Sequence, residues 1–318
     1  MDMQFFNALN LNVDIFKETR SDIFMSRTGS IPQYSGLTRA TIYANTGKME
    51  NKGIEFSLDY NKQINKDLFV SFKSTFTYAH NTVLEQDEPS FLEYPWKSKV
   101  GHSVDMLMGW VSNGLFPDEE SIKNAPNQGK GLPVLPGDIW YLDQPNVYGE
   151  KDGIIDNNDK VYMGYPTNPE IIYGFGPSIK WKNWDCSFFF QGAARVSLMM
   201  SGIHPFGNTT LTNVRQFIAD DYWSEANPNP NAKYPRLSVE SNSHNTEYSD
   251  YWLRNAAFLK LKNAELGYTF KNMRFYLSGS NLLTFSPFKE WDPEMGGGNG
   301  LKYPTQRVFN LGFQMTFK

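Results

Sequence analysis

One acidic stretch, Asp152–Asp159, has the residue types and spacing of a calcium-binding loop. Such loops carry oxygen ligands at their first, third, fifth, seventh, ninth and twelfth positions, and a glycine at the sixth. With Gly153 as the sixth residue, the predicted ligands are Glu150, Asp152, the Ile154 backbone carbonyl, Asp156 and Asp159. The first position then falls on Tyr148, a poor ligand, so Asp143 is a candidate for that place if the chain folds back.

An acidic turn without metal is the competing interpretation of this stretch. The twelfth position is the aspartate Asp159, where calcium loops of this kind carry a longer glutamate that binds through both oxygens. We therefore expect Ca²⁺ binding here to be weak. Nothing else in the sequence requires a cofactor.

Other reactive side chains show no arrangement that specifies catalysis. The four histidines have neither metal-ligand spacing nor a nucleophile partner; they are His80, His102, His204 and His244. The sequence has no nucleophile-elbow, phosphate-loop or zinc-protease motif. Adjacent carboxylates such as Asp220 and Asp221 do not specify the separation that a glycosidase needs. We expect a protein that is not an enzyme.

Aromatic residues near the long connections are candidates for ligand contact. They are Trp96, Trp140, Tyr141, Trp223 and Trp252. Sugar rings stack on aromatic faces and peptides also pack there, because these side chains offer large apolar surfaces with a polar edge. Ordinary loop packing and anchoring at a membrane interface are the alternatives for each residue.

Charge and hydropathy exclude two classes of protein. The formal net charge is −4, from 30 basic and 34 acidic residues, which gives no reason to expect nucleic-acid binding. No segment approaches the roughly 18 consecutive apolar residues of a transmembrane helix. The mean hydropathy of −0.51 suits a soluble protein. It equally suits a β-barrel, in which only every second strand residue faces lipid.

Strict alternation of apolar and polar residues is the main structural signal. It extends over residues 9–15, 54–60, 68–78, 184–190 and 309–317. Within 259–270 the alternation changes phase near Asn263, which predicts a β-bulge. A short helical turn is expected within 118–126.

The predicted connections are alternately short and long. Tight turns at 63–66, 181–183 and 271–272 separate long segments at about 18–50, 81–168, 195–255 and 285–305. An outer-membrane barrel has short periplasmic turns and long extracellular loops, whereas a soluble sandwich has no physical reason for this asymmetry. The pattern predicts about eight up-and-down strands, the last of which ends at the periplasmic face.

Short motifs are spread along the whole chain. In chain order they are NTGKMENKGIE (45–55), PGDI (136–139), DGIIDNND (152–159), GYP (164–166), YGF (173–175), FFFQG (188–192), YW (222–223), NP (227–228), YPRL (234–237), LRNAAFLKLKN (253–263), LGY (266–268), SNL (280–282), WDPE (291–294) and YP (303–304). Each is weak alone, but in this order they resemble specifically the motifs of the SusC/RagA group of TonB-dependent outer-membrane transporters. The family's acidic loop is uninterrupted, whereas this chain carries an insertion at 144–151.

The resemblance implies an all-β fold, with residues 1–318 forming the C-terminal part of a large, plugged, antiparallel up-and-down transmembrane β-barrel. Segments 81–168 and 195–255 are then long extracellular loops. Such barrels have about 22 strands, so about eight cannot make the wall. The family's signal sequence, plug and TonB-contacting segment have no counterpart here, so we expect a fragment or a truncated gene model. An independent eight-stranded barrel is the alternative.

The resemblance also implies a function, namely import of oligosaccharides or peptides across the cell outer membrane. The expected partners are a SusD-like surface lipoprotein, the TonB complex acting through the missing N-terminal region, the ligand and outer-membrane lipid. The rivals are a secreted, soluble, β-rich carbohydrate-binding domain and a surface hydrolase. Only a barrel requires Phe56, Phe72, Phe188 and Phe313 all to face outward.

Overall fold

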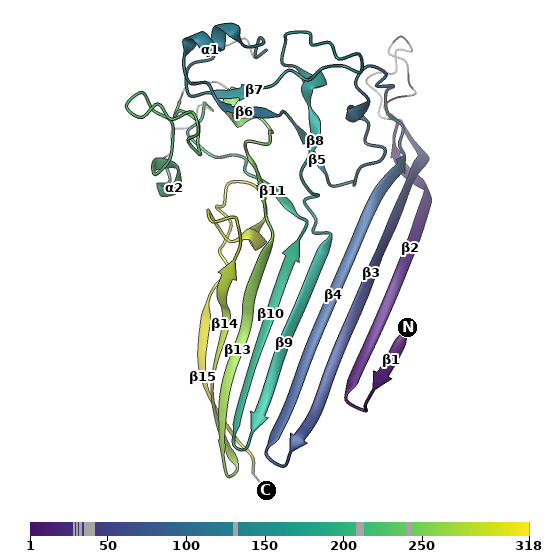
Figure 1. Cartoon of the computed structure of the whole chain (residues 1–318), viewed down its shortest axis with the longest axis vertical. Coiled ribbons are helices and arrows are strands. Elements are labelled where there is room, and N and C mark those ends of the chain that lie inside the picture. Colours follow the sequence, from purple (N-terminus) through teal and green to yellow (C-terminus); the bar gives the residue numbers. More distant parts are fainter. Residues whose placement is uncertain are drawn as a thin grey trace.

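One antiparallel sheet of nine strands organises the molecule (Figure 1). The computed structural model describes residues 1–318 except 28, 30, 32–33, 35–41, 130–132, 208–212, 240–242 and 318. In sheet order the strands are β1 (Asp2–Phe5), β2 (Leu9–Ser26), β3 (Tyr43–Asn65), β4 (Leu68–Glu85), β9 (Ile171–Trp181), β10 (Trp184–Ala194), β13 (Phe258–Phe270), β14 (Met273–Phe285) and β15 (Val308–Met315). Sheet order follows chain order, so the predicted up-and-down meander is confirmed, with the short β1 added.

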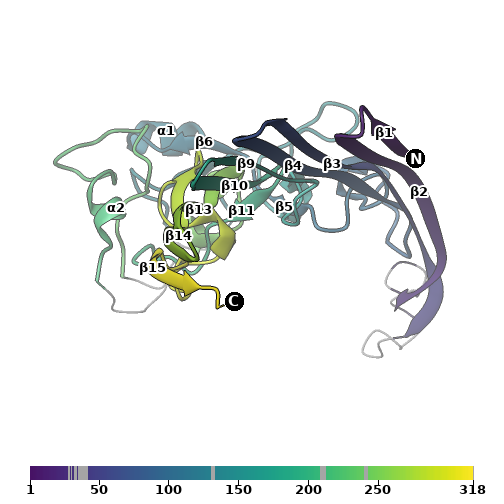
Figure 2. The ribbon, with the colours of Figure 1, turned by 90° about the horizontal axis from the view of Figure 1, so that it is seen from below.

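The sheet is an arc and does not close on itself. Viewed from below, the strands run from β2 to β15 along a curve whose ends stay apart (Figure 2). Among the described residues, β1 pairs only with β2, and β15 pairs only with β14. The fold is therefore a partial barrel wall with two strand edges whose backbone groups lack a neighbouring strand.

The two faces of the sheet differ in polarity. Strand register places Phe56 beside Phe76 and Phe72 beside Pro177. It places Phe188 beside Ala264 and Phe313 beside Phe275. Because side chains alternate along each strand, this register puts all four predicted phenylalanines on one face. Exposed apolar residues share that face, including Ile15, Ile179, Trp181, Leu266, Leu277 and Leu311. Such a continuous apolar face is expected of a wall in lipid, and neither soluble rival explains it.

The tight turns lie where the sequence predicts them. They connect β3 to β4, β9 to β10 and β13 to β14. Lys182 and Lys271 have φ of 53°, the left-handed conformation that two-residue hairpin turns require.

The first long connection is shorter than predicted. β2 continues to Ser26 and β3 begins at Tyr43, so the predicted loop 18–50 is wrong by several residues at each end. Crossing a bilayer takes about 9–11 strand residues, and β2 and β3 have 18 and 23. Residues 18–22 of β2 and 45–53 of β3 are mostly polar, so the alternation is lost in the upper part of each strand. At the other end, β15 stops at Met315, so Phe317 lies beyond the strand.

A β-bulge in β13 changes which residues face inward. The register with β14 shifts between Leu261 and Asn263, and the register with β10 shifts between Phe189 and Phe190. This confirms the bulge predicted near Asn263. Lys262 is the extra residue, and it lies on the same side as Lys260, since both lysines bind Glu294.

The long loops hold short elements of their own. Three two-stranded sheets pair β5 (Leu107–Gly109) with β8 (Val161–Met163), β6 (Ser112–Leu115) with β7 (Ile139–Tyr141), and β11 (Ser197–Met199) with β12 (Leu253–Asn255). The helices are α1 (Glu119–Asn124), within the predicted 118–126, and α2 (Gln216–Ala219). In the part of the chain that the structure describes, no helix has the length and apolar content to cross a membrane.

The hydrophobic core lies mainly in these loops and meets the wall at Ala193 of β10. Its members come from both long loops and include Leu115, Ile139, Tyr141, Leu198, Phe206, Ile218, Tyr234 and Trp252. Buried polar groups join the two loops. Asn245 accepts the Ile139 N–H at 2.9 Å and donates to Asp138 at 2.7 Å, and Arg236 pairs with Asp138 at 2.6 Å. The loops therefore form one folded unit above the wall.

The open edges lead to a prediction about the chain on its own. Unpaired backbone groups in lipid cost several kcal/mol each, and an exposed edge recruits other strands. We expect the 318-residue chain, expressed alone, to aggregate or fail to insert. Size-exclusion chromatography in detergent measures this. A stable, monodisperse, heat-modifiable species would contradict the prediction and favour an independent barrel.

Candidate ligand-binding site between the outer loops and the wall

A cavity of about 520 Å³ lies where the outer loops meet the inner face of the wall. The wall contributes Ile172 from β9, Gln191 from β10 and Phe258 from β13. The loops contribute Met199 and the run Gly296–Gly298. The lining is mainly apolar, and its polar side chains are those of Thr167, Gln191, Ser197, Ser201, Tyr248 and Glu294. Such a site can hold one unit of an oligomer and orient it by a few hydrogen bonds.

Glycines form the loop side of this cavity because the backbone passes too close for side chains. A Cβ on Gly297 would lie 2.7 Å from the Met199 carbonyl oxygen. Gly298 donates its N–H to that carbonyl at 2.8 Å, and Ser201 donates to Gly298 at 2.9 Å. The glycine-rich run thus pairs with the end of β11, and this pairing positions one side of the cavity.

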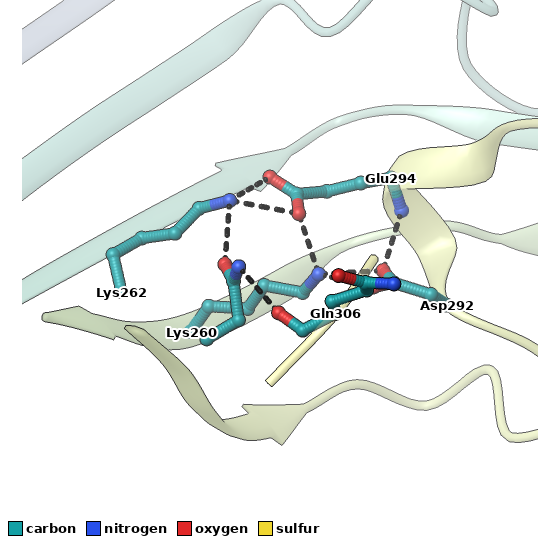
Figure 3. A network of polar contacts seen from close by, with 6 residues as sticks. Lys260, Lys262, Asp292, Glu294 and Gln306 are labelled. Carbon is teal, nitrogen blue, oxygen red and sulfur yellow. Dashed lines mark hydrogen bonds and ion pairs between the residues drawn. The ribbon is translucent and has the colours of Figure 1, made fainter. Parts of the chain in front are cut away.

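A buried lysine ties the last outer loop to the inner wall (Figure 3). The Lys260 side chain is 1% exposed, and its Nζ contacts the two Asp292 oxygens at 2.6 and 2.5 Å and Glu294 at 2.5 Å. Lys262 binds the second Glu294 oxygen at 2.7 Å. Burial by itself raises the pKa of Asp292, but hydrogen bonding and charge from Lys260 outweigh it, so this pKa is lowered. Sequence reasoning missed this network, and its only signal was a lysine pair at the predicted bulge.

Asp143 folds back onto the acidic loop. Its Oδ2 accepts the N–H of Gly153 at 2.8 Å, although ten residues separate them along the chain. Gly153 has φ of +79°, as the turn glycine of such a loop requires. Glu150, predicted at the third ligand position, lies in the insertion, where its carboxylate accepts a hydrogen bond from Asn146. Asp143, the candidate for the first position, thus lies beside the turn glycine.

Backbone N–H groups hold the other carboxylates of this loop. Asp159 accepts from Gln144 and from Asp156, both at 2.7 Å. Burial raises the pKa of Asp159, the two N–H donors oppose that rise, and the charge of Asp143 adds to it. Asp152 accepts from Ile154. Among the residues that the structure describes, no three acidic, histidine or cysteine side chains gather into a metal-binding group by themselves.

Three of the five aromatic candidates for ligand contact are buried. Tyr141, Trp223 and Trp252 lie in the loop core. A ligand cannot reach Tyr141 and Trp252 in this arrangement, whereas Trp223 also lines a surface cavity beside Leu135 and Arg236. Trp96 and Trp140 stay partly exposed, and contact with ligand remains a prediction for them. The physical reason is that loops of this length need a hydrophobic core, and aromatic residues supply the largest apolar area.

The histidines bind neighbouring protein groups. His80 contacts Glu170 at 2.5 Å at the rim of the wall, and Glu170 also pairs with Arg195. His102 stacks on Tyr162, and burial lowers the His102 pKa. His244 contacts the Ile139 carbonyl at 2.6 Å.

Comparisons with known proteins agree with the fold. No family model matches the chain. It is 29% identical over 337 residues to TonB-dependent receptor P26 of Formosa agariphila, covering 95% of this chain and 32% of that protein. It is 24% identical over 297 residues to TonB-dependent receptor SusC of Bacteroides thetaiotaomicron, covering 87% of this chain and 27% of SusC. The chain thus spans about a third of the length of the curated relatives it matches.

Solved structures have the same fold. The RagAB peptide importer in its open-open state superposes with a TM-score of 0.71 at 21% identity, over 98% of this chain and 33% of that chain. The RagAB peptide transporter gives 0.69 at 24% identity. The partial wall and its outer loops are therefore those of a TonB-dependent transporter barrel. In sequence and fold, the chain matches a portion, about a third, of the SusC/RagA-type TonB-dependent receptors, which are outer-membrane transporters and not enzymes.

Proposed function

We propose that the protein containing this chain imports an oligomeric nutrient across the outer membrane by a TonB-dependent route. The observation that carries this proposal is the cavity between the inner wall and the folded outer loops. A ligand there touches the wall through Ile172 and Gln191 and the loops through Met199, on the inner side of the sheet. The apolar outer face is available to lipid.

The proposed partners follow from the same arrangement. A SusD-like surface lipoprotein would cover the outer loops, which offer it a folded surface built on a shared core. The similarity to the RagAB peptide importer supports a two-component assembly. Energy would come from the TonB complex, which acts on a part of the receptor outside this chain.

The proposed substrate is an oligosaccharide or an oligopeptide. We would test this in a strain that lacks the gene, by growth and uptake on single oligosaccharides and on defined oligopeptides. Loss of growth on one class, restored by the gene and abolished without TonB, is the expected result. Unchanged uptake of both classes would refute import of oligomeric nutrients.

A pair of adjacent substitutions tests the role of the cavity. Ile172 lines the cavity, and the neighbouring Ile171 lies on the opposite, lipid-facing side of β9. We expect Ile172→Trp to fill part of the cavity and weaken substrate binding about tenfold, equivalent to roughly 1.4 kcal/mol. Ile171→Trp adds a similar side chain toward lipid and should leave binding unchanged. Equal affinity of both variants, measured by calorimetry on the full-length protein, would exclude the cavity as the binding site.

A further inference from the structure

The acidic loop between β7 and β8 contains two buried carboxylates. The Asp143 side chain is 3% exposed and that of Asp159 is 2% exposed. They lie at opposite ends of the loop, and Asp159 accepts the N–H of Gln144, the residue next to Asp143. The insertion between them leaves the loop as an exposed excursion that carries Val147 and Tyr148. The fold thus brings the two ends of the loop together, although the insertion separates them along the chain.

One of these carboxylates has an unsatisfied oxygen. Asp143 Oδ2 binds the Gly153 N–H, while Asp143 Oδ1 is buried and has no hydrogen-bond partner among the described residues. No described lysine or arginine forms an ion pair with Asp143 or Asp159. A buried carboxylate oxygen without a donor or a cation is costly, so it points to a positive ligand.

The atoms of this loop that could coordinate a cation are all oxygens, which limits the kinds of cation that it can bind. Asp152 and Asp156 are exposed at the open side of the loop, and each accepts one local N–H, from Ile154 and from Asn158. Ca²⁺ takes six to eight oxygen ligands in flexible geometry, including carboxylates, backbone carbonyls and water. Zn²⁺ favours histidine and cysteine, and neither takes part in the hydrogen bonds of this loop.

We propose that this loop binds Ca²⁺, with Asp143 in the first ligand position and Asp159 in the last. In the structure no three of these described carboxylates converge, so binding requires Asp152 and Asp156 to turn toward the ion. The Ile154 carbonyl and water supply the remaining oxygens. A loop whose side-chain ligands are all aspartates, with no bidentate glutamate, belongs with the extracellular calcium modules, whose dissociation constants are about 10⁻⁴–10⁻³ M.

The ion would stabilise the contacts that this loop makes with its neighbours. Trp110 donates its indole N–H to the Asp156 carbonyl at 2.7 Å, and Lys97 donates to Asn158 at 2.8 Å. Asn127 pairs with the backbone on both sides of Ile154. Calcium therefore connects distant parts of the outer-loop unit, which is distinct from transport itself.

Terbium luminescence on the full-length protein tests the proposal, because Trp110 is close enough to sensitise a bound lanthanide. We expect sensitised Tb³⁺ emission that CaCl₂ displaces and MgCl₂ does not at equal concentration. Asp143→Asn keeps an oxygen for the Gly153 N–H but removes the charge, and should weaken Ca²⁺ binding at least tenfold. Glu150→Gln is the matched control and should bind as the parent does. Loss of binding in Glu150→Gln with none in Asp143→Asn would overturn the assignment.

A second measurement keeps the test decisive if Asp143→Asn folds poorly. In the unsubstituted protein, Ca²⁺ should slow proteolysis within 144–151 relative to chelator, because the ion fixes both ends of the excursion. Neither Tb³⁺ emission nor protection at 10 mM Ca²⁺, about ten times the weakest expected dissociation constant, would refute the site. Both readouts measure binding alone, so their failure is independent of the import proposal.

Discussion

Replacing Lys260 by methionine is expected to release segment 286–307 from the inner wall. Lys260 compensates both Asp292 and Glu294 from a fully buried position. Removing one partner of a buried ion pair leaves uncompensated charge and typically costs 3–5 kcal/mol. Lys262 still pairs with Glu294, so we expect a loss of about 3 kcal/mol, at the lower end of that range. Hydrogen exchange of residues 292–300 in the full-length protein measures the free energy of local opening.

Lys262→Met is the matched control for this experiment. Lys262 is partly exposed and its main partner, Glu294, keeps Lys260, so the loss should stay below about 1 kcal/mol. If both variants exchange alike, the buried lysine is not what holds the loop. A triple variant, Lys260→Met with Asp292→Asn and Glu294→Gln, should recover part of the loss, because it leaves no charge unpaired.

The same network predicts how the loop responds to acid. The folded-state pKa of Asp292 is lowered, so Asp292 contributes stability above its unfolded pKa of about 3.8. That contribution is lost as the pH falls through the lower, folded-state pKa. We therefore expect the opening free energy of 292–300, from exchange corrected for its intrinsic pH dependence, to be unaffected by Asp292 protonation above about pH 4 and to fall below it. A fall already between pH 5 and 7 would contradict this assignment.

A charge on the outward face should disrupt the wall, whereas the same charge one residue away should not. Leu277 is 54% exposed on the apolar face of β14, opposite Leu266. Leu277→Arg places a guanidinium in lipid, which costs about 2–4 kcal/mol near the membrane midplane. We expect a smaller folded fraction of the full-length protein by heat-modifiable electrophoresis. Urea unfolding should show the corresponding loss in unfolding free energy.

Ser278→Arg provides the comparison on the inner face. Ser278 pairs with Glu265 in β13 and with Asn310 in β15, so an arginine there meets a carboxylate and water. Its effect should stay below about 1 kcal/mol. An equal loss of unfolding free energy in both variants would mean that the two faces contact the same solvent. The assignment of the Leu277 face to lipid would then fail.

The wall of the molecule could be predicted from the sequence because alternation along a strand is a property of neighbouring residues. Each strand in lipid must alternate, so residues such as Phe56, Phe188 and Phe313 carry the period directly. The phase change at Asn263 predicted the bulge for the same reason. The prediction failed for the upper parts of β2 and β3, where most residues are polar and the period is lost.

The candidate sites could be predicted only in part. Asp152, Asp156 and Asp159 follow from spacing within one short segment. The cavity could not be predicted, because its lining joins Ile172, Met199 and Gly297, which come from three distant parts of the chain. Tyr141 and Trp252 were predicted to meet ligand, and burial in the loop core removed them.

The sequence by itself determined the alternating strands, their turns and the composition of the acidic loop, since each of these depends on neighbouring residues, and the order of its motifs indicated the family resemblance. Tertiary structure decided the shared core of the two long loops, the burial of Lys260 between two carboxylates, and the return of Asp143 to Gly153 across the insertion. Those contacts join residues far apart along the chain. They form because the loops must bury apolar area and pair their buried charges. Many combinations of residues meet these two requirements, so the sequence alone does not show which residues pair.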